Sequence, residues 1–569
     1  MKNKILVPLL IVFISIIYGL PNLILNSKLG SNYTPFTLSG KSPIARDETY
    51  AYAPFVNYIL QGHLFLKDVY VAEYSKYPTP FMGESVPSIV FALLAKITGS
   101  IENAFIVADF IFPPIIFLLL FMLAKFFIKN RLYALASAFV VTVARDFIAV
   151  IPLPHETIQY LTVAKGQNYL LYLSRAFHPQ LTFIFLMLAL ISFIKLAKSP
   201  RAKKYIIASG ITFGILFYSY VFYWTYFVVF FFLMFIYFVI KREKAIVLSL
   251  IISGSLAFVI TIPYLLNLYD FYRLDLAQDF IAKASLKNVP VPLTLIRYFL
   301  IAALFFISSP KRTKTVYIFL TFLAAGIAIA PFSKIILGQD LETFHYLRRA
   351  LMPFATIAFF ITIYNLFKSR KQIQNILALL LIAAFIAFAI RSQIIATQKI
   401  QPFQSIDENQ QKTLEWLREN TPRGSVIGSI DPDFESVVPV YTYNKVFFPP
   451  TDRTITPAEE GVTRYAILGD ILSISPDWQK KNLDNIISYL FIYQSYNSKG
   501  NLDPNSPKRI WAEGEIERVS KNWTSELNRF KLDYVIVTPK EIAIANPSKL
   551  LLTEVASFGK YKIHKYKSQ

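Results

Sequence analysis

Cysteine is absent from this chain of 569 residues, which excludes disulfides, zinc–thiolate sites and a thiol nucleophile. Acidic residues are few, since 36 Asp and Glu stand against 58 Lys and Arg, a formal net charge of +22. The sequence also lacks internal repeats and low-complexity tracts. It therefore excludes a repeat protein and a disulfide-stabilised scaffold.

Apolar residues dominate instead, at 54% of the chain, with 16% aromatic residues. Soluble domains are rarely this apolar, so the sequence predicts an α-helical polytopic membrane protein. Residues 5–25 follow Lys2 and Lys4 without a small-x-small cleavage pattern, which predicts a retained signal-anchor helix. We expect about eleven membrane helices, at 5–25, 104–128, 132–150, 180–198, 205–221, 223–240, 245–266, 293–309, 315–331, 350–367 and 374–395.

The basic excess follows the predicted topology. With a cytoplasmic N-terminus, the short inner loops hold 19 Lys and Arg against one acidic residue, Glu243. The outer loops hold 15 basic and 13 acidic residues. This asymmetry is the positive-inside bias, so the charge does not point to nucleic acid. We expect residence in the cytoplasmic membrane, with the chain extracytoplasmic after about residue 396.

The sequence predicts two domains. Residues 1–396 form the membrane domain, whose outer loop 26–103 includes an apolar stretch, 85–98, that is too short to span and is expected to be interfacial. Residues 397–569 mix helical and strand patterns and are expected to form an extracytoplasmic α/β domain. Its expected strands lie at 425–430, 445–448, 532–538, 551–556 and 561–566, and its expected helices at 407–420, 457–473 and 478–494.

The first outer loop carries carboxylates among tyrosines. Asp47 and Glu48 follow the first helix, where one could act as a base on an acceptor hydroxyl, although a solvated acidic pair gives the same pattern. Asp68 and Glu73 suit a sugar, because neighbouring rings can cover its apolar face; a compact loop on the membrane surface is the alternative.

Basic residues of later outer loops are candidate phosphate ligands. Arg175 and His178 precede a membrane helix, although an arginine that snorkels to lipid headgroups would look the same. Positive charge at an outer helix end is not explained by topology, so the basic cluster near residue 345 indicates a lipid phosphate. That cluster consists of His345, Arg348 and Arg349.

Three further features complete the candidates. His155 and Glu156 are the remaining candidate substrate or phosphate ligands of the second outer loop. No oxygen-ligand spacing predicts a metal, and a divalent cation stays an open possibility. Asp109 is an ionisable residue in or near a membrane helix, which is a functional hypothesis in itself. Tyr218, Tyr220, Tyr223, Trp224 and Tyr226 are interpreted mainly as an aromatic belt, with stacking on a sugar as the alternative.

This layout resembles the GT-C superfamily of membrane glycosyltransferases, in particular families related to protein O-mannosyltransferases and aminoarabinose transferases. The matching runs are Arg46-Asp47-Glu48-Thr49-Tyr50, Ile59-Leu60-Gln61-Gly62, Lys67-Asp68-Val69-Tyr70 and the stretch 416–427. The resemblance implies inverting transfer of a sugar from a polyprenyl-phosphate donor to a glycan, lipid or protein acceptor.

In that resemblance Asp47 would supply the base, with Glu48 as the alternative. Arg175, His345, Arg348 and Arg349 would stabilise the departing lipid phosphate. The chain departs from the pattern at Asp109, where related sequences often carry arginine. A non-enzymatic flippase, transporter or envelope assembly factor is the alternative, although a transporter should place more charge inside the membrane.

Overall fold

The computed structural model describes residues 2–36, 52–144, 147–148, 171, 173–284, 294–337, 342–449, 453–491, 505–547 and 551–567. The chain forms two compact units, and each is assembled from separate parts of the sequence. Unit 1 comprises Met1–Lys28, Leu94–Tyr264 and Val289–Gln401. Unit 2 comprises Leu29–Leu93, Leu265–Asn288 and Pro402–Gln569.

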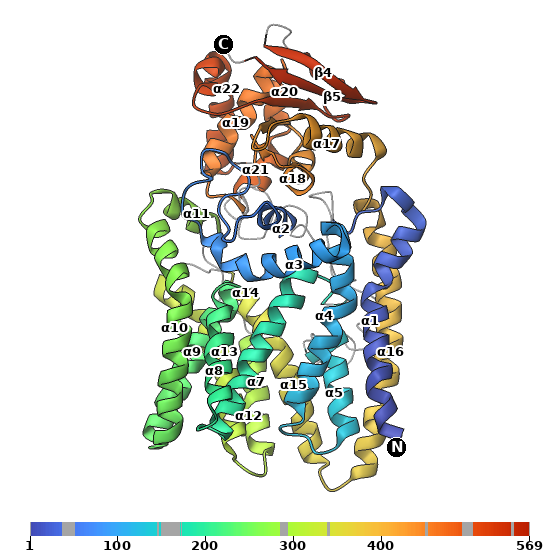
Figure 1. The fold of residues 1–569 in the computed structure, drawn as a ribbon, viewed down its shortest axis with the longest axis vertical. Helices are drawn as coiled ribbons and strands as arrows, with labels where there is room; N and C mark the ends of the chain where they lie inside the picture. Colours follow the sequence, from blue (N-terminus) through green and yellow to red (C-terminus); the bar gives the residue numbers. More distant parts are fainter. Residues whose placement is uncertain are drawn as a thin grey trace. The chain divides into compact units, whose positions relative to one another are not determined.

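Unit 1 is a bundle of apolar helices that run side by side (Figure 1). Two segments of this unit, Ala176–Leu181 and Tyr346–Leu351, are wider, π-type turns. The helices are α1 (Lys2–Leu29), α4 (Ile101–Ala124), α5 (Arg131–Ala144), α7 (Thr182–Lys198), α8 (Lys203–Leu216), α9 (Val221–Ile240), α10 (Lys244–Tyr272), α12 (Thr294–Ser308), α13 (Lys314–Leu337), α14 (Thr343–His345), α15 (Met352–Leu366) and α16 (Lys371–Ile400), with the turns η5 (Ala176–Leu181) and η6 (Tyr346–Leu351).

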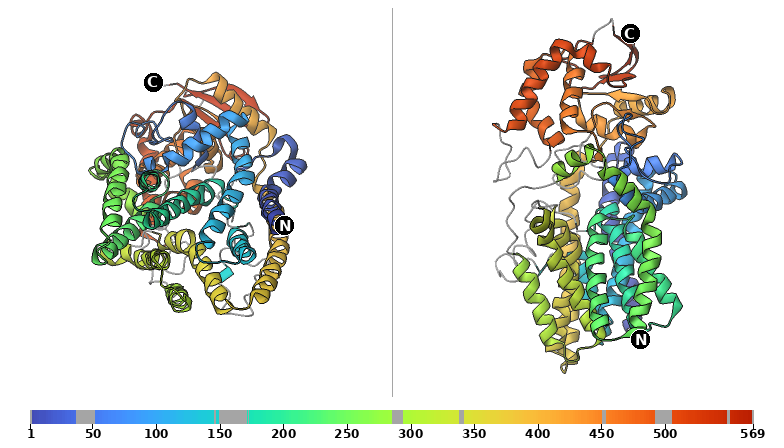
Figure 2. Two further views of the ribbon diagram at one scale, coloured as in Figure 1. Left: turned by 60° about the horizontal axis from the view of Figure 1, so that its bottom comes forward. Right: turned by 90° about the vertical axis from the view of Figure 1, so that its left-hand side faces the viewer.

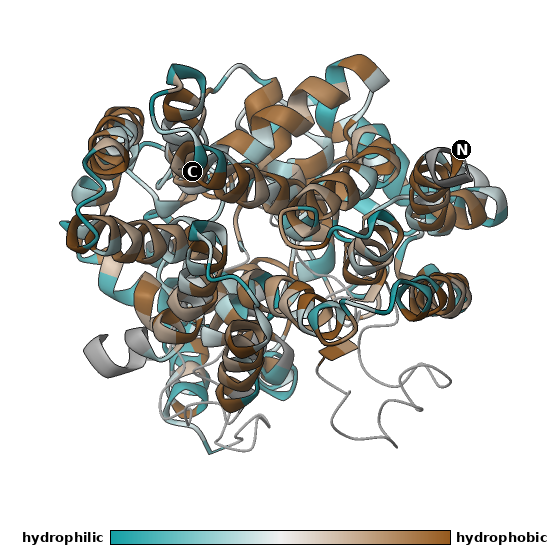
Figure 3. Ribbon diagram, turned by 90° about the horizontal axis from the view of Figure 1, so that it is seen from below, coloured by the Kyte–Doolittle hydropathy of each residue, from teal (hydrophilic) through white to brown (hydrophobic). Residues whose placement is uncertain are grey.

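These helices expose large apolar side chains on their outer faces. Ile5, Phe258, Phe299 and Leu380 are each at least 60% exposed. Viewed along the bundle, the helices carry apolar residues around much of their circumference (Figure 3). A helix that is apolar all round belongs in lipid rather than water, so the chain is an integral, multi-span membrane protein.

Nine stretches of the described chain are long and apolar enough to cross a membrane, so the predicted count of eleven is not confirmed. The predicted spans 132–150, 205–221 and 293–309 fall on helices of 14, 14 and 15 residues. The ninth stretch, Pro80–Thr98, includes the expected interfacial segment. It reaches 19 residues because a 3₁₀ turn at Pro80–Glu84 runs directly into the helix Ser85–Thr98.

Two glycines explain how α8 packs against α10. A Cβ on Gly210 would lie 2.8 Å from the carbonyl oxygen of Ser253, and one on Gly214 would lie 2.8 Å from Ile260. Small residues four apart allow two membrane helices to approach closely. Figure 2 shows the same bundle from two further directions.

Unit 2 is a mixed α/β unit with one five-stranded sheet. Strand order is β2-β1-β3-β5-β4, in which β1 pairs in parallel with β2 and β3, and β5 pairs antiparallel with β3 and β4. All five expected strands are confirmed. They are β1 (Val426–Gly428), β2 (Lys445–Val446), β3 (Tyr534–Val537), β4 (Leu552–Phe558) and β5 (Tyr561–Tyr566).

The helices that we expect at 407–420 and 457–473 of unit 2 are confirmed. The helix that we expect at 478–494 is divided into two, and two helices that the sequence did not predict lie at Pro432–Tyr441 and Pro507–Leu527. The apolar faces of the helices at 458–471, 483–491 and 507–527 pack with β1 and β3 in one buried core. The helices are α2 (Ala53–Leu60), η3 (Pro80–Glu84), α11 (Leu276–Ala284), α17 (Glu408–Asn420), α18 (Pro432–Tyr441), α19 (Ala458–Ile471), α20 (Pro476–Lys481), α21 (Leu483–Phe491) and α22 (Pro507–Leu527), while α3 (Ser85–Thr98) is shared by both units.

Part of the expected first outer loop is built into unit 2. The side-chain amide of Asn57 donates to the carbonyls of Pro439 and Thr442 at 2.9 and 2.7 Å. The amide of Val446, in β2, donates to the carbonyl of Tyr70 at 2.9 Å. These bonds tie residues that lie more than 350 positions apart into one folded unit.

Candidate functional site

Four side chains from three separated segments of unit 1 meet in one cluster: His178, Tyr220, His345 and Arg349. The Tyr220 hydroxyl lies 2.5 Å from Nδ1 of His345 and accepts a hydrogen bond from Nη1 of Arg349 at 2.7 Å. The guanidinium also lies over the Tyr220 ring, 5.6 Å from its centre. Tyr220 is therefore the centre of the cluster and orients two predicted phosphate ligands.

His178 packs against the same tyrosine from the turn before α7. Its ring centre lies 4.3 Å from that of Tyr220, and its Nδ1 lies 3.0 Å from the hydroxyl of Thr182. The His178 side chain is buried. Glu342 approaches Nε2 of His345 at 3.7 Å, so the cluster includes one carboxylate at its edge.

The cluster lies where three helical stretches begin. Tyr220 immediately precedes α9, His178 precedes α7, and the stretch from Thr343 through η6 leads into α15. The first amides of a helix have no partner within the helix and carry partial positive charge. Together with the guanidinium, they favour an anion at this end of the bundle.

The other predicted basic residues lie differently. Arg348 is exposed, whereas Arg175 is partly buried at the start of the turn before α7. The carbonyl of Arg175 accepts a hydrogen bond from the amide of Gln180 at 3.2 Å. The described contacts therefore unite His178, His345 and Arg349, and leave the phosphate-binding roles of Arg175 and Arg348 as predictions.

Asp109 lies within α4 and is held by two amide side chains. It accepts hydrogen bonds from Asn22 at 2.9 Å and from Gln180 at 2.5 Å. Gln180 is two residues from His178 in the same turn, and it also donates to the carbonyl of Leu173. The carboxylate of Asp109 is therefore part of a polar network that is connected to the cluster through η5, the turn that contains both Gln180 and His178.

The two described carboxylates of the expected sugar-binding loop are bonded to the protein. Asp68 is buried and accepts hydrogen bonds from the amides of Tyr70, Val71 and Ile455 and from the hydroxyl of Thr454. All four donors lie in unit 2, so Asp68 holds a turn of the first outer loop to the segment after β2. Ligand binding by Asp68 stays a prediction.

Glu73 is likewise an anchor. One oxygen lies 3.1 Å from Arg464, and the other accepts the amide of Lys531 at 2.8 Å. Arg464 is fully buried, also pairs with Glu460 at 2.7 Å, and lies over the ring of Phe530. This buried arginine binds the loop, α19 and the segment before β3 together.

Four predicted residues, Asp47, Glu48, His155 and Glu156, lie outside the described residues, so their roles stay predictions. Within the described ranges, no group of three or more His, Asp or Glu is arranged to hold a metal ion.

The sequence interpretation missed the role of Tyr220, which it assigned to the aromatic belt. One signal in the sequence could have indicated it. Tyr220 directly precedes the long apolar run 221–240, so it lies at the start of a helix. Its partners His345 and Arg349 lie more than 120 residues away, and no local pattern connects them.

The chain is a polytopic membrane protein, and its fold is similar to that of a solved structure, ArnT. The apo structure of ArnT from Cupriavidus metallidurans aligns over 100% of both chains with a TM-score of 0.50 at 10% sequence identity. The same protein bound to undecaprenyl phosphate aligns with a TM-score of 0.48 at 10% identity, over 97% of this chain and 99% of that one.

The apo oligosaccharyltransferase of Archaeoglobus fulgidus aligns over 93% of this chain and 69% of that one, with a TM-score of 0.47 and 14% identity. No protein-family model matches the chain, and no curated protein matches it. At these identities the similarity establishes the fold alone.

Proposed function

We propose that the protein is a membrane glycosyltransferase that transfers a sugar from a polyprenyl-phosphate donor to an acceptor on the extracytoplasmic face. The observation that carries this proposal is the cluster around Tyr220, which gathers a guanidinium, two imidazoles and three helix beginnings inside an apolar bundle. The GT-C fold shared with ArnT supports the same class of reaction.

The cluster suits a phosphate attached to a lipid. A guanidinium presents parallel N–H donors that match two phosphate oxygens, and Tyr220 holds that of Arg349 in one orientation. The surrounding helices offer apolar surface for a polyprenyl chain. A soluble anion would not need that surface, so the combination favours a lipid-borne phosphate.

In the proposed reaction, an acceptor oxygen attacks C1 of the sugar as the bond between C1 and the phosphate oxygen breaks. A base removes the proton from the acceptor, and the configuration at C1 is inverted. Negative charge grows on the departing polyprenyl phosphate, where Arg349 and the histidines would stabilise it. We assign the base to Asp47, with Glu48 as the alternative.

The test compares Asp47→Asn with Glu48→Gln in proteoliposomes that contain an undecaprenyl-phosphate-linked sugar and an envelope extract as acceptor. We expect Asp47→Asn to insert normally and to release no undecaprenyl phosphate, while Glu48→Gln retains turnover. Full turnover in both variants would refute the proposal that a carboxylate of this loop acts as the base. Lipid movement across the bilayer without sugar transfer by the wild type would favour a flippase instead.

A further inference from the structure

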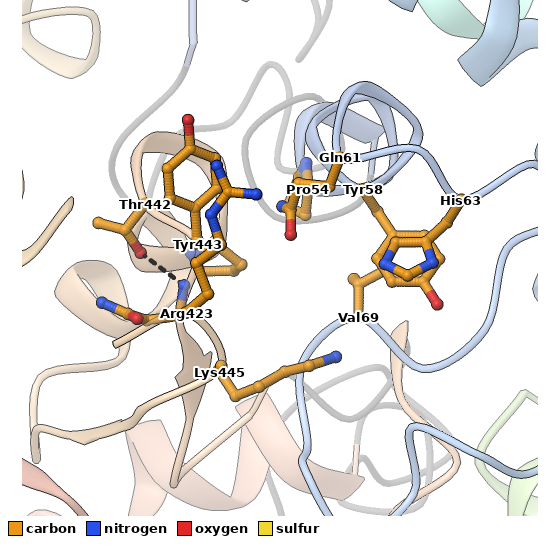
Figure 4. A pocket seen from close by; sticks show the side chains of 12 residues that line it. Pro54, Tyr58, Gln61, His63, Val69, Arg423, Thr442, Tyr443 and Lys445 are labelled. Atoms are coloured by element: carbon orange, nitrogen blue, oxygen red, sulfur yellow. Dashed lines mark hydrogen bonds between the residues drawn. The ribbon is translucent and has the colours of Figure 1, made fainter. Parts of the chain in front are cut away.

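Unit 2 contains a pocket of about 290 Å³ that has no part in the proposed transfer step. Two stretches of unit 2 line it, one from α2 to Val69 and the other from Arg423 to Lys445. In Figure 4, Arg423 lies beside Tyr443 on one side, and the Lys445 ammonium extends toward Tyr58 and His63 on the other.

The two charged side chains that line this pocket, Arg423 and Lys445, are both cations. Arg423 lies over the Tyr443 ring at 4.3 Å and, among the described residues, its side chain makes no hydrogen bond or ion pair. The ammonium of Lys445 donates to the carbonyl of Asp68 at 2.8 Å and lies 5.7 Å from the Tyr58 ring. None of the described lining residues is Asp or Glu. The Asp68 carboxylate lies near Lys445 and Tyr58, but four protein donors bind it, so an anion is the complementary ligand for the two lining cations.

The remaining lining combines stacked rings with polar groups. Tyr58 and His63 stack at 4.0 Å with only 14° between their planes. Asn444 is 3% exposed, and its amide nitrogen donates to the Thr421 hydroxyl at 2.7 Å. Its buried carbonyl oxygen has no hydrogen-bond partner among the described residues and can accept a bond from a ligand hydroxyl.

The volume of the pocket limits the size of the ligand that it can bind. Small-molecule pockets usually enclose about 300–1,000 Å³, so this pocket lies at the lower limit. It accommodates one ring with its substituents rather than a long chain. Rings that cover an apolar face, a hydroxyl acceptor and two cations together match a sugar ring that bears an acidic group.

We propose that this pocket binds one acidic sugar unit, a monosaccharide ring with a carboxylate held between Arg423 and Lys445. The apolar face of the sugar packs on the Tyr58–His63 pair, and a ring hydroxyl donates to Asn444. Every contact lies within unit 2, so the proposal holds whether or not the protein transfers sugars. Burial lowers the pKa of Lys445 to about 8, which leaves it cationic at pH 7.

The test measures binding of methyl glucuronide and methyl glucoside to the full-length protein in detergent by isothermal titration calorimetry. We expect saturable binding of the glucuronide only. Arg423→Gln should weaken it at least tenfold, which corresponds to 1.4 kcal/mol. Arg418→Gln is the matched control, because this arginine lies in α17 of the same unit, does not line the pocket and, among the described residues, pairs with Glu419 at 3.5 Å.

Lys445→Met provides a second test, with its fold verified by circular dichroism, and should also weaken binding at least tenfold. Equal binding of the glucoside, unchanged binding by Arg423→Gln, or equal weakening by Arg418→Gln would overturn the proposal. Inorganic phosphate that competes as strongly as the glucuronide would overturn the sugar assignment and identify a simple anion site. These binding measurements do not depend on transferase turnover, so either proposal can fail without the other.

Discussion

Replacing Tyr220 with phenylalanine isolates the hydroxyl that organises the candidate phosphate site. The variant keeps an aromatic ring, so packing with His178 and the cation–π contact with Arg349 persist. It loses the hydrogen bond from Arg349 at 2.7 Å and the contact with His345 at 2.5 Å. The guanidinium then keeps its ring contact but loses the directed bond to the Tyr220 hydroxyl.

The expected loss follows from those two bonds. A hydrogen bond to a charged group is worth about 1.5–3 kcal/mol, and a neutral one about 0.5–1.5 kcal/mol. Because the ring contacts remain, we expect only the lower part of this range to appear in ligand binding. The affinity for undecaprenyl phosphate should therefore fall about tenfold, equivalent to about 1.4 kcal/mol.

Native mass spectrometry of the protein titrated with undecaprenyl phosphate measures this change directly. Tyr226→Phe is the matched control, because Tyr226 lies in α9, six residues after Tyr220, and its hydroxyl donates to the carbonyl of Phe322 at 2.6 Å and not to the cluster. We expect Tyr226→Phe to bind the lipid as the wild type does. Unchanged affinity in Tyr220→Phe, or equal losses in both variants, would refute the role given to Tyr220.

Two further predictions concern the carboxylates of unit 2. Asp68→Asn replaces an acceptor of four hydrogen bonds and should destabilise the unit by roughly 3 kcal/mol, so that its thermal unfolding midpoint falls by several degrees; an unchanged midpoint would contradict an anchoring role. Burial and nearby Asp431 raise the pKa of Glu541 from 4.5 to about 7, so its ionisation opposes folding. Its contribution to stability should fall by up to roughly 3 kcal/mol as pH rises from 4.5 through 7. In Glu541→Gln the fall, followed by thermal unfolding at several pH values, should be smaller by that amount, and what remains comes from Asp431, Glu435 and Asp470, whose pKa values are also raised by burial.

The parts of the fold that the sequence predicts are those that depend on local pattern. Long apolar runs identify the membrane helices, since the length needed to cross a bilayer is fixed by the bilayer itself. The run Leu532–Thr538 identifies β3 because its apolar and β-branched residues are buried on both faces. Helix α18 (Pro432–Tyr441) was missed because Pro439 lies within it and disrupts the helical pattern.

The site depends on contacts that local pattern does not contain. Asp68 among tyrosines has the composition of a sugar-binding loop, yet Thr454 and Ile455, more than 380 residues away, donate to its carboxylate. Arg464 has no marker in sequence that distinguishes it from a surface arginine. Its complete burial between two glutamates and an aromatic ring appears only in the folded unit.

These contacts bear on the choice of the catalytic base among the carboxylates of the first outer loop. A general base needs an oxygen that an acceptor hydroxyl can reach. Both oxygens of Asp68 are bonded to protein donors, and those of Glu73 contact Arg464 and Lys531, so using either as a base would break the assembly of unit 2. We therefore keep Asp47 as the proposed base, with Glu48 as the alternative, and an inactive, folded Asp47→Asn protein is the result that would distinguish catalysis from anchoring.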